Sequence, residues 1–438
     1  MSRAGWWSLW LVATLCLNAG SARAFTFQVK NERELTRALA RLRPGNTVLL
    51  ADGVYRTSLR LTRSGTADEP ILIRAAHPGR AVIDAAGLPT ALEHNGQTHI
   101  HVDGLVFRNA QNPPQAEQAM VRAGNHWTLR GCTFEHATGA GLGLPGVRHV
   151  RVLDAVVQHN GQIGIAVSGS QHVLIRDTLI AHNNDGFDTE AEIDRARIAE
   201  KVPHRGRWYT NPAWEAGGMK ISSSTDVRLE RIHAHDNIGP ALWADYNNRD
   251  VLFLDCHVHH NRNLVEGWEG IGIFVEYNAQ GPIAVRGCRV EANQGPGLAV
   301  AESRHVTLEN NYFIDDELEF RDMQRPGTMF QHITATDNVF ERAVVQTSLG
   351  TWDPDSGAVK SITLERNHWR GEAVFRWGGQ TFRGLDEIRR HLGFENQPPS
   401  PPEAEPSPPE AETVPPEAVP TPSEAESAPG QGGIADPG

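Results

Sequence analysis

The sequence predicts an all-β solenoid: a single-stranded right-handed parallel β-helix with a short capping helix at each end. Three observations predict it. A segment rich in Val, Ile and Leu recurs about every 23 to 30 residues, and most of these segments end in Asn. Helical periodicity is confined to the two ends of residues 25–397. A turn of roughly that length, built from three short strands, is the period of a parallel β-helix.

The repeat places one asparagine at the same corner of successive coils. The segments end in Asn160, Asn183, Asn237, Asn261 and Asn293. Five residues before each Asn lies one repeated position, which continues in both directions as Leu105, Cys132, Ala155, Thr178, Ile232, Cys256, Cys288, Asn311, Asn338 and Asn367. Because coils stack at about 4.8 Å, we expect the amides to form a hydrogen-bonded ladder that offsets the cost of burying them.

Both ends of the stack carry a predicted cap, as a solenoid requires. Near the start, Asn31 and Glu34 form a capping box, and the helix that follows has apolar residues at helical spacing and ends at Pro44. Those apolar residues are Leu35, Leu39 and Leu42. Near the end, residues 385–392 have the pattern of a second short helix, which Gly393 ends.

The two termini have compositions of their own. Residues 1–24 have a basic start, a short apolar run and an Ala-x-Ala site, which predict a signal peptide cleaved after Ala24 and a secreted or periplasmic protein. The run is too short to favour a membrane-spanning helix. Residues 398–438 hold 13 of the 27 prolines and no Lys, Arg or His, which predicts a disordered tail. The β-helix domain is therefore expected at 25–397.

Charge and cysteine content narrow the function classes. The formal net charge is −12, which argues against nucleic acid as a partner; no membrane insertion is expected, and we expect a monomer. No Cys/His spacing is typical of a zinc site. Cys256 and Cys288 fall one coil apart in the repeated column, where stacked small apolar side chains are favoured over a disulfide.

Three charged residues interrupt apolar strands at similar places in successive coils. Lys220, Asp245 and Glu276 precede the next repeated position by 12, 11 and 12 residues, so we expect them on one face, with Glu302 as a less secure fourth member. Isolated charges in apolar strands are costly unless they line a cleft or pair with each other. The face is thus either a catalytic surface or a solvated set of ion pairs.

Aromatic residues near this face are expected to bind substrate. Two long excursions, about 188–215 and 264–270, interrupt the coils, and loops on a rigid scaffold commonly carry binding residues. Indole and phenol faces stack on sugar rings. The expected substrate-binding residues are Trp208, Tyr209, Trp214, Trp243, Trp268 and Tyr277; ordinary loop packing would explain the same residues.

The N-terminal third resembles a known family. Residues 43–55, 69–79 and 101–109 resemble the opening of pectate-lyase-like β-helix proteins, and most closely alginate lyases and chondroitinase B of polysaccharide lyase family six. Residues 220–223, Lys-Ile-Ser-Ser, resemble the lysine motif of that family. The arginine that the family places one coil later is absent, and Asp245 stands near its place, so the family mechanism does not transfer intact.

Four functions remain open from the sequence. The resemblance favours a lyase that cleaves a uronate-containing polysaccharide by β-elimination, with Lys220 as base and with Ca²⁺, if a metal is bound, on Asp245 and Glu276. The alternatives are a glycoside hydrolase that uses Asp245 and Glu276, a C5-epimerase, and a non-catalytic carbohydrate-binding or structural protein. His233 stacks over His257, and His235 over His259; they could bind metal or act as bases, although the repeat alone explains their register.

Overall fold

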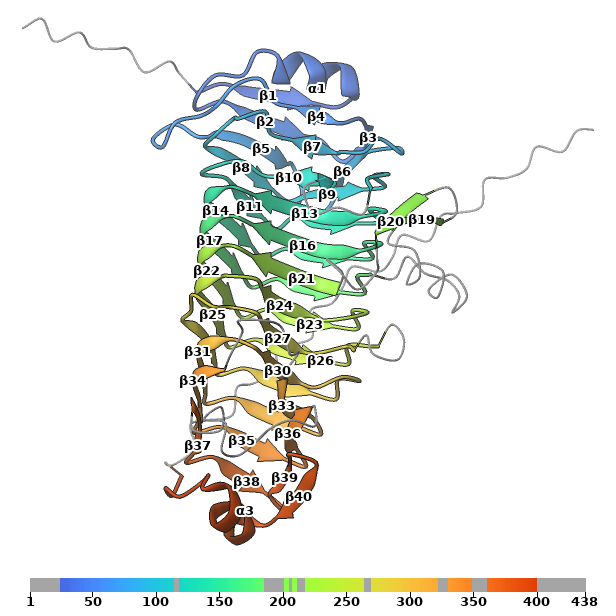
Figure 1. The fold of residues 1–438 in the computed structure, drawn as a ribbon. Helices are drawn as coiled ribbons and strands as arrows, with labels where there is room; N and C mark the ends of the chain where they lie inside the picture. Colours follow the sequence, from blue (N-terminus) through green and yellow to red (C-terminus); the bar gives the residue numbers. More distant parts are fainter. Residues whose placement is uncertain are drawn as a thin grey trace, which may run out of the picture. The chain divides into compact units, whose positions relative to one another are not determined.

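The computed structural model describes residues 24–113, 118–184, 201–204, 207–210, 217–263, 269–321, 330–348 and 361–399, with the backbone alone at 201–204, 207–210 and 348. The predicted signal peptide and nearly all of the predicted tail lie outside these residues. Within them the chain winds through three sheets, here named A, B and C, which are parallel except for the last two strands of sheet C, and successive coils add strands to A, B and C in that order (Figure 1).

Sheet A has 13 described strands: β1 (Thr26–Val29), β2 (Thr47–Leu50), β5 (Ile71–Ala75), β8 (Ile100–Asp103), β11 (Thr128–Arg130), β14 (Arg148–Leu153), β17 (Gln171–Arg176), β22 (Thr225–Glu230), β25 (Arg249–Leu254), β28 (Ile283–Arg286), β31 (Arg304–Glu309), β34 (Gln331–Thr336) and β37 (Ile362–Glu365). Sheet B has 12: β3 (Gly53–Arg56), β6 (Ala81–Asp84), β9 (Leu105–Arg108), β12 (Thr133–Glu135), β15 (Val156–Gln158), β18 (Leu179–Ala181), β23 (His233–His235), β26 (His257–His259), β29 (Arg289–Glu291), β32 (Tyr312–Ile314), β35 (Val339–Glu341) and β38 (His368–Arg370).

Sheet C has 13 described strands: β4 (Leu59–Arg60), β7 (Leu92–Glu93), β10 (Val121–Arg122), β13 (Ala140–Pro145), β16 (Ile163–Ser168), β21 (Gly217–Ser222), β24 (Leu242–Asp245), β27 (Ile273–Glu276), β30 (Leu298–Ala301), β33 (Glu317–Arg321), β36 (Val344–Ser348), β39 (Val374–Trp377) and β40 (Gln380–Arg383). A separate antiparallel hairpin, β19 (Lys201–His204) with β20 (Arg207–Thr210), comes from the first long excursion.

The two predicted caps are present. Helix α1 (Glu32–Leu39) begins at Asn31, whose side chain accepts a hydrogen bond from the Glu34 amide, and the Lys30 amide donates back to Glu34. Helix α3 (Leu385–Leu392) ends at Gly393 in the left-handed conformation, φ 69°. Neither helix has the length and apolarity to cross a bilayer, and no other helix in the described part of the chain has them.

The core lies inside the coils, because alternate strand residues point inward. The inward positions are apolar almost throughout, as in β25, where Val251 and Phe253 are buried between outward neighbours. The predicted repeat column is confirmed by the strand register. Cys256 and Cys288 lie in it as buried free thiols, not as a disulfide.

The predicted asparagine ladder is confirmed at the corner between sheets B and C. Asn160 donates to Asn183 (2.9 Å), Asn183 to Asn237 (3.0 Å), and the series continues through Asn261 to Asn293. A glycine column faces it: a Cβ at Gly164 would lie 2.9 Å from the Asn183 amide nitrogen and 2.6 Å from the next coil's carbonyl. Gly141, Gly218 and Gly272 contact the ladder in the same way, whereas Ala241 stands in this column between Gly218 and Gly272.

Two further ladders stack at the other corners. Asn311, Asn338 and Asn367 bond in sequence between sheets A and B, as the column predicts. A third series, between sheets C and A, escaped sequence inspection because it contains both serine and asparagine: Ser170, Ser224, Asn248, Asn278 and Ser303.

Two of the ladders end in a carboxyl group rather than an amide. Asn293 donates to Asp316 (2.8 Å), and Asn367 donates to Glu395 (2.6 Å). Burial raises the pKa of Asp316 to about 7 against the hydrogen bonds that it accepts, and it raises that of Glu395 to about 7 likewise. The final member of a ladder has no further side chain to donate to, so an acceptor alone suffices there.

We expect Asp316→Asn to stabilise the protein at pH 8 and to leave it unchanged near pH 4. The folded pKa lies above the ordinary value of 3.8, so the stability that this carboxyl gives is complete below about pH 4 and is lost as the pH rises towards 7. A shift of this size corresponds to about 2–4 kcal/mol. Denaturant midpoints measured between pH 4 and pH 8 test this difference.

Asp315→Asn is the matched control. Asp315 precedes Asp316 in the chain, and its exposed carboxylate pairs with Arg342. The hydrogen bond from Arg342 lowers the pKa of Asp315. Neutralising Asp315 should therefore lower the denaturant midpoint slightly at pH 8, whereas Asp316→Asn raises it. A difference between Asp316→Asn and wild type that stays constant from pH 4 to pH 8 would contradict the assignment.

Candidate functional site

The three charged residues predicted as a site lie together on the outer face of sheet C. The Lys220 ammonium nitrogen is 3.0 Å from Asp245 Oδ2 and 3.9 Å from the centroid of the Trp243 ring. The Trp243 indole N–H donates to Glu276 Oε2 at 3.1 Å. The side chains of Lys220 and Asp245 are 15% and 19% exposed. We call this connected set of four residues the active face.

The three residues share one face, as the sequence predicts, but Lys220 lies two residues away from the register position of Asp245 and Glu276. Asp245 does stand beside Glu276 on the next strand, but the partner of Asp245 on β21 is Ser222, and Lys220 stands beside Trp243. The turn from sheet C to sheet A is one residue longer after Asp245 than after Ser222, with three residues instead of two. Counting back from the next repeat therefore shifts the register. Lys220 still reaches Asp245 because residues two apart share a face.

An apolar cluster supports the active face from the next coils. It comprises Trp243, Ile271, Phe274, Ala299 and Ala301 and is separate from the main core. Trp243 and Phe274 stack with their ring centroids 5.6 Å apart. Ala301, not Glu302, continues the column from Glu276. Such an apolar surrounding strengthens the electrostatic interaction between Lys220 and Asp245 relative to water.

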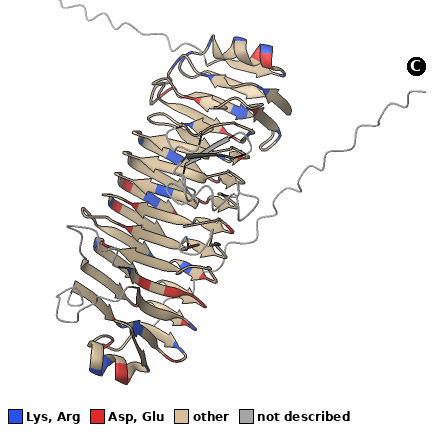
Figure 2. Cartoon of the chain, turned by 45° about the vertical axis from the view of Figure 1, so that its right-hand side comes forward, with Lys and Arg blue, Asp and Glu red and all other residues tan. Residues whose placement is uncertain are grey.

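Sequence reasoning missed the charged group at the far side of this cluster. Arg321 on β33 forms ion pairs with Glu319 and with Glu269. On β30, the strand between Glu276 and this group, the outward positions hold Ala299 and Ala301. The pattern of outward charged residues is therefore broken there, and the sequence does not indicate the group beyond it. In the view of Figure 2, basic and acidic residues are interspersed along the coils.

The structure describes the side chains of only two of the predicted aromatic binders, Trp243 and Tyr277. Trp243 is only 7% exposed and contacts Lys220 and Glu276. Tyr277 pairs with Tyr246, which the sequence analysis missed and which is 49% exposed; their ring centroids are 5.5 Å apart. Of Trp208 and Tyr209 the backbone alone is described, in β20. Trp214 and Trp268 lie outside the described residues.

The outer face of sheet B carries a second polar cluster. The predicted stacking is confirmed, since His233 lies over His257 and His235 over His259, with ring centroids 5.1 and 5.0 Å apart. Burial and the neighbouring imidazoles lower the pKa of His233 to about 4 and that of His259 to about 3. Burial opposes ionisation of Glu291, but hydrogen bonds from Arg289 and His257 outweigh it and lower its pKa to about 2.

Comparison with known proteins supports the fold. Residues 117–313 match the family model described as right handed beta helix region, and residues 29–141 match the model described as chondroitinase B. A search of curated proteins found no match. The chain is therefore a right-handed parallel β-helix whose N-terminal part resembles chondroitinase B, as the sequence predicts.

Solved structures show the same fold at low identity. The A-module of a mannuronan C-5 epimerase from Azotobacter vinelandii aligns over 82% of this chain and 98% of its own, with a TM-score of 0.53 and 12% identity. An alpha-1,3-glucanase catalytic unit from Streptomyces thermodiastaticus aligns over 80% and 64%, with a TM-score of 0.54 and 13% identity. A mannuronic acid specific family 6 lyase from human gut microbiota aligns over 86% and 92%, with a TM-score of 0.50 and 13% identity.

Proposed function

We propose that the protein is an exported polysaccharide lyase that cleaves a uronate-containing polymer by β-elimination on the active face. The observation that carries the proposal is the pairing of Lys220 with Asp245, 3.0 Å apart and largely shielded from water. A cation and a carboxylate held side by side can engage the carboxyl group and the adjacent C–H of one sugar. A lyase, an epimerase and a glucanase of the same fold support activity on a polysaccharide.

In this proposal Lys220 and Asp245 have different roles. Lys220 supplies the cation that neutralises the uronate carboxylate, and Asp245, held 3.0 Å from it, is the base. Asp245 removes the proton on C5, the electron pair forms the C4=C5 double bond, and the C4–O bond breaks. The leaving oxygen takes a proton from water. General-base catalysis of this kind is worth about 10²–10⁴-fold in rate.

Glu276 and the two tyrosines that follow the acidic residues have supporting roles in this proposal. Glu276 orients the Trp243 indole, which in turn lies against Lys220. The Tyr246 and Tyr277 rings follow Asp245 and Glu276 directly in the chain. They offer an aromatic surface for a neighbouring sugar. We also retain Trp208, Tyr209, Trp214 and Trp268 as proposed contributors to substrate binding from the two excursions.

The described residues do not by themselves fit a calcium ion on Asp245 and Glu276. Ca²⁺ usually takes about six to eight oxygen ligands. No third His, Cys, Asp or Glu of the described chain clusters with these two carboxylates, and Lys220 already occupies one Asp245 oxygen. The mechanism above therefore takes no step through a metal, and assays with added CaCl₂ or with EDTA test whether activity depends on one.

Hydrolysis is the second candidate because Asp245 and Glu276 are register partners on adjacent strands. Parallel strands lie about 4.8 Å apart, close to the roughly 5 Å carboxyl separation of retaining glycosidases. In that reaction Glu276 would act as the acid and Asp245 as the nucleophile, and no double bond would form.

An assay on the purified protein separates these functions. Polymannuronate, polyguluronate, polygalacturonate, dermatan sulfate and neutral glucans are incubated with the protein, with CaCl₂ or with EDTA. Ultraviolet absorbance of an unsaturated uronate, lost in Lys220→Ala, would support elimination. Reducing ends without absorbance would support hydrolysis, and a change in uronate configuration without cleavage would support epimerisation. No product from any polymer, together with measurable binding, would favour a carbohydrate-binding protein.

A further inference from the structure

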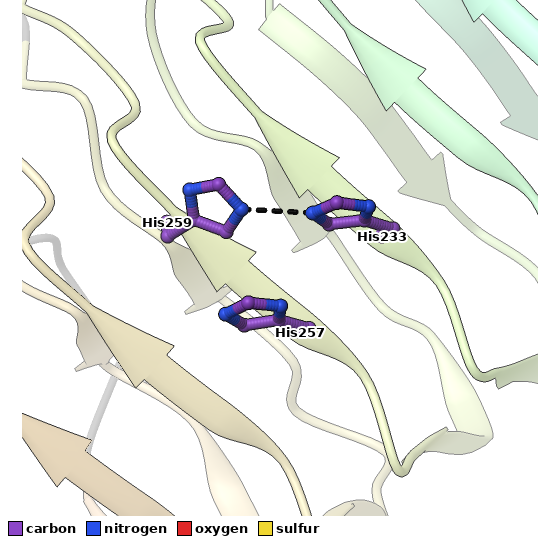
Figure 3. A group of neighbouring side chains, drawn as sticks. All are labelled: His233, His257 and His259. Carbon is purple, nitrogen blue, oxygen red and sulfur yellow. Dashed lines mark hydrogen bonds between the residues drawn. The ribbon is translucent and has the colours of Figure 1, made fainter. Parts of the chain in front are cut away.

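Three histidines on the outer face of sheet B converge through their ring nitrogens. The Nε2 atoms of His233 and His259 are 2.8 Å apart, and a nitrogen of each of the three rings, that of His257 included, lies within 4.8 Å of the other two (Figure 3). His233 lies on β23, and His257 and His259 lie on β26. The two strands are adjacent and paired in register. This rigid base fixes where the rings lie before any ligand arrives.

His257 has a free nitrogen and a partner that orients its ring. Its Nε2 is 2.7 Å from Glu291 Oε1, and Arg289 holds the other Glu291 oxygen at 2.9 Å. The other ring nitrogen, Nδ1, is buried without a hydrogen-bond partner. A metal-binding histidine commonly places one nitrogen on the ion and the other on a carboxylate, which fixes the tautomer and the ring. His259 is oriented similarly, since its Nδ1 is 2.7 Å from His260.

We propose that His233, His257 and His259 bind one divalent transition-metal ion, for which Zn²⁺ is the best fit. Three neutral imidazoles with a fourth, open position match the ligand set of tetrahedral zinc sites. Imidazole nitrogen does not suit Ca²⁺ or Mg²⁺, which prefer oxygen. The ion would lie between the Nε2 atoms of His233 and His259 in place of their present contact. The unpaired nitrogen of His257 would be its third ligand.

A second group, His182, His235 and Asp236, also brings one ligand atom of each residue within 4.8 Å of the others. The rest of the histidine stack, at the ends of β12, β15 and β18, has a different geometry. The His136, His159 and His182 rings lie nearly parallel, with interplanar angles of 11° and 3° and centroids 5.4 and 5.0 Å apart. His233 and His259 instead meet at 40° with their nitrogens facing each other.

The expected effect of the ion is to join two coils from the outside. The three ligands come from β23 and β26, so one ion would connect both coils next to the first long excursion of the chain. Binding to the folded state alone raises stability by mass action. The site is on sheet B and the active face on sheet C, so this proposal is independent of the polysaccharide activity.

The test uses the full chain without a histidine tag, because a tag binds the same ions. After treatment with EDTA and gel filtration, the protein is titrated with Zn²⁺, Co²⁺ and Ca²⁺ by calorimetry, and its metal content is measured by mass spectrometry. We expect one equivalent of Zn²⁺, a higher unfolding temperature, and a visible Co²⁺ spectrum typical of a tetrahedral site. Ca²⁺ should produce none of these changes.

Variants assign the ligands. His257→Ala and His259→Ala should weaken Zn²⁺ binding at least about 100-fold, and Glu291→Gln should weaken it about 10–100-fold by releasing the His257 ring. His149→Ala removes an exposed histidine from a stack at another corner and should bind Zn²⁺ as wild type does. Folded protein that takes up no Zn²⁺ would overturn the proposal. Uptake that survives in His257→Ala, or that is lost only in His182→Ala, would do so as well.

Discussion

Asp245→Asn should lower the rate of cleavage at least about 100-fold and leave the fold unchanged, because it removes the proposed base while keeping an oxygen that accepts from Lys220. Lys220→Ala should lower the rate of cleavage by a similar factor, because the cation that neutralises the uronate carboxylate would be missing. Initial rates on the polymer that gives the strongest signal test both variants. Circular dichroism and the unfolding midpoint report whether each variant is folded.

The control variants and Glu276 decide between the mechanisms. Asp226→Asn changes an exposed aspartate that pairs with His172, and Lys30→Ala changes an exposed lysine next to α1; both should keep full activity. In elimination, Glu276→Gln should reduce the rate less than Asp245→Asn, because its role is to orient Trp243. Equal and severe loss in both carboxylate variants would favour hydrolysis. Wild-type activity in Asp245→Asn would show that catalysis does not use this residue.

The sequence alone was sufficient to predict the fold because a solenoid repeats its constraints. Each Asn of the first ladder needs its neighbours one coil away, so the same residue recurs at a period that can be read without a structure. The capping helices were also readable, since the hydrogen bonds of Asn31 and Glu34 are local. The ladder containing Ser170 and Asn248 was missed because different residue types fill one structural role.

The candidate site was only partly predictable. The pattern identified Lys220, Asp245 and Glu276 as outward charges, and the structure does bring them together. It could not give their pairing, because turn length between sheets C and A sets the register and no residue pattern marks the extra residue before Arg249. The contact of Trp243 with both Lys220 and Glu276 depends on side-chain direction. The histidine columns were visible, but the convergence of their nitrogens was not.

Asn237→Ala should destabilise the protein by about 3–6 kcal/mol, the largest stability effect that we expect from a single ladder residue. The Asn237 amide group donates to the carbonyls of Ile180 and His235, and its oxygen accepts from Asn183. Asn237 is fully buried, so water cannot replace these partners, and each unsatisfied group costs about 1–3 kcal/mol. The denaturant midpoint measures the loss; Asn95→Ala, at an exposed loop position, should leave it unchanged.

Asn237→Asp tests whether position in the ladder decides which side chain is tolerated. In the middle of the ladder a carboxylate would lose the donation to Asn261 and would face its oxygen. At the end, Asp316 only accepts, from Asn293 and from the Glu317 amide. Asn237→Asp should therefore destabilise the protein at pH 8 at least as much as Asn237→Ala, whereas Asp316→Asn stabilises it. If both exchanges changed the midpoint in the same direction, the ladder would not have the donor-to-acceptor polarity on which both predictions depend.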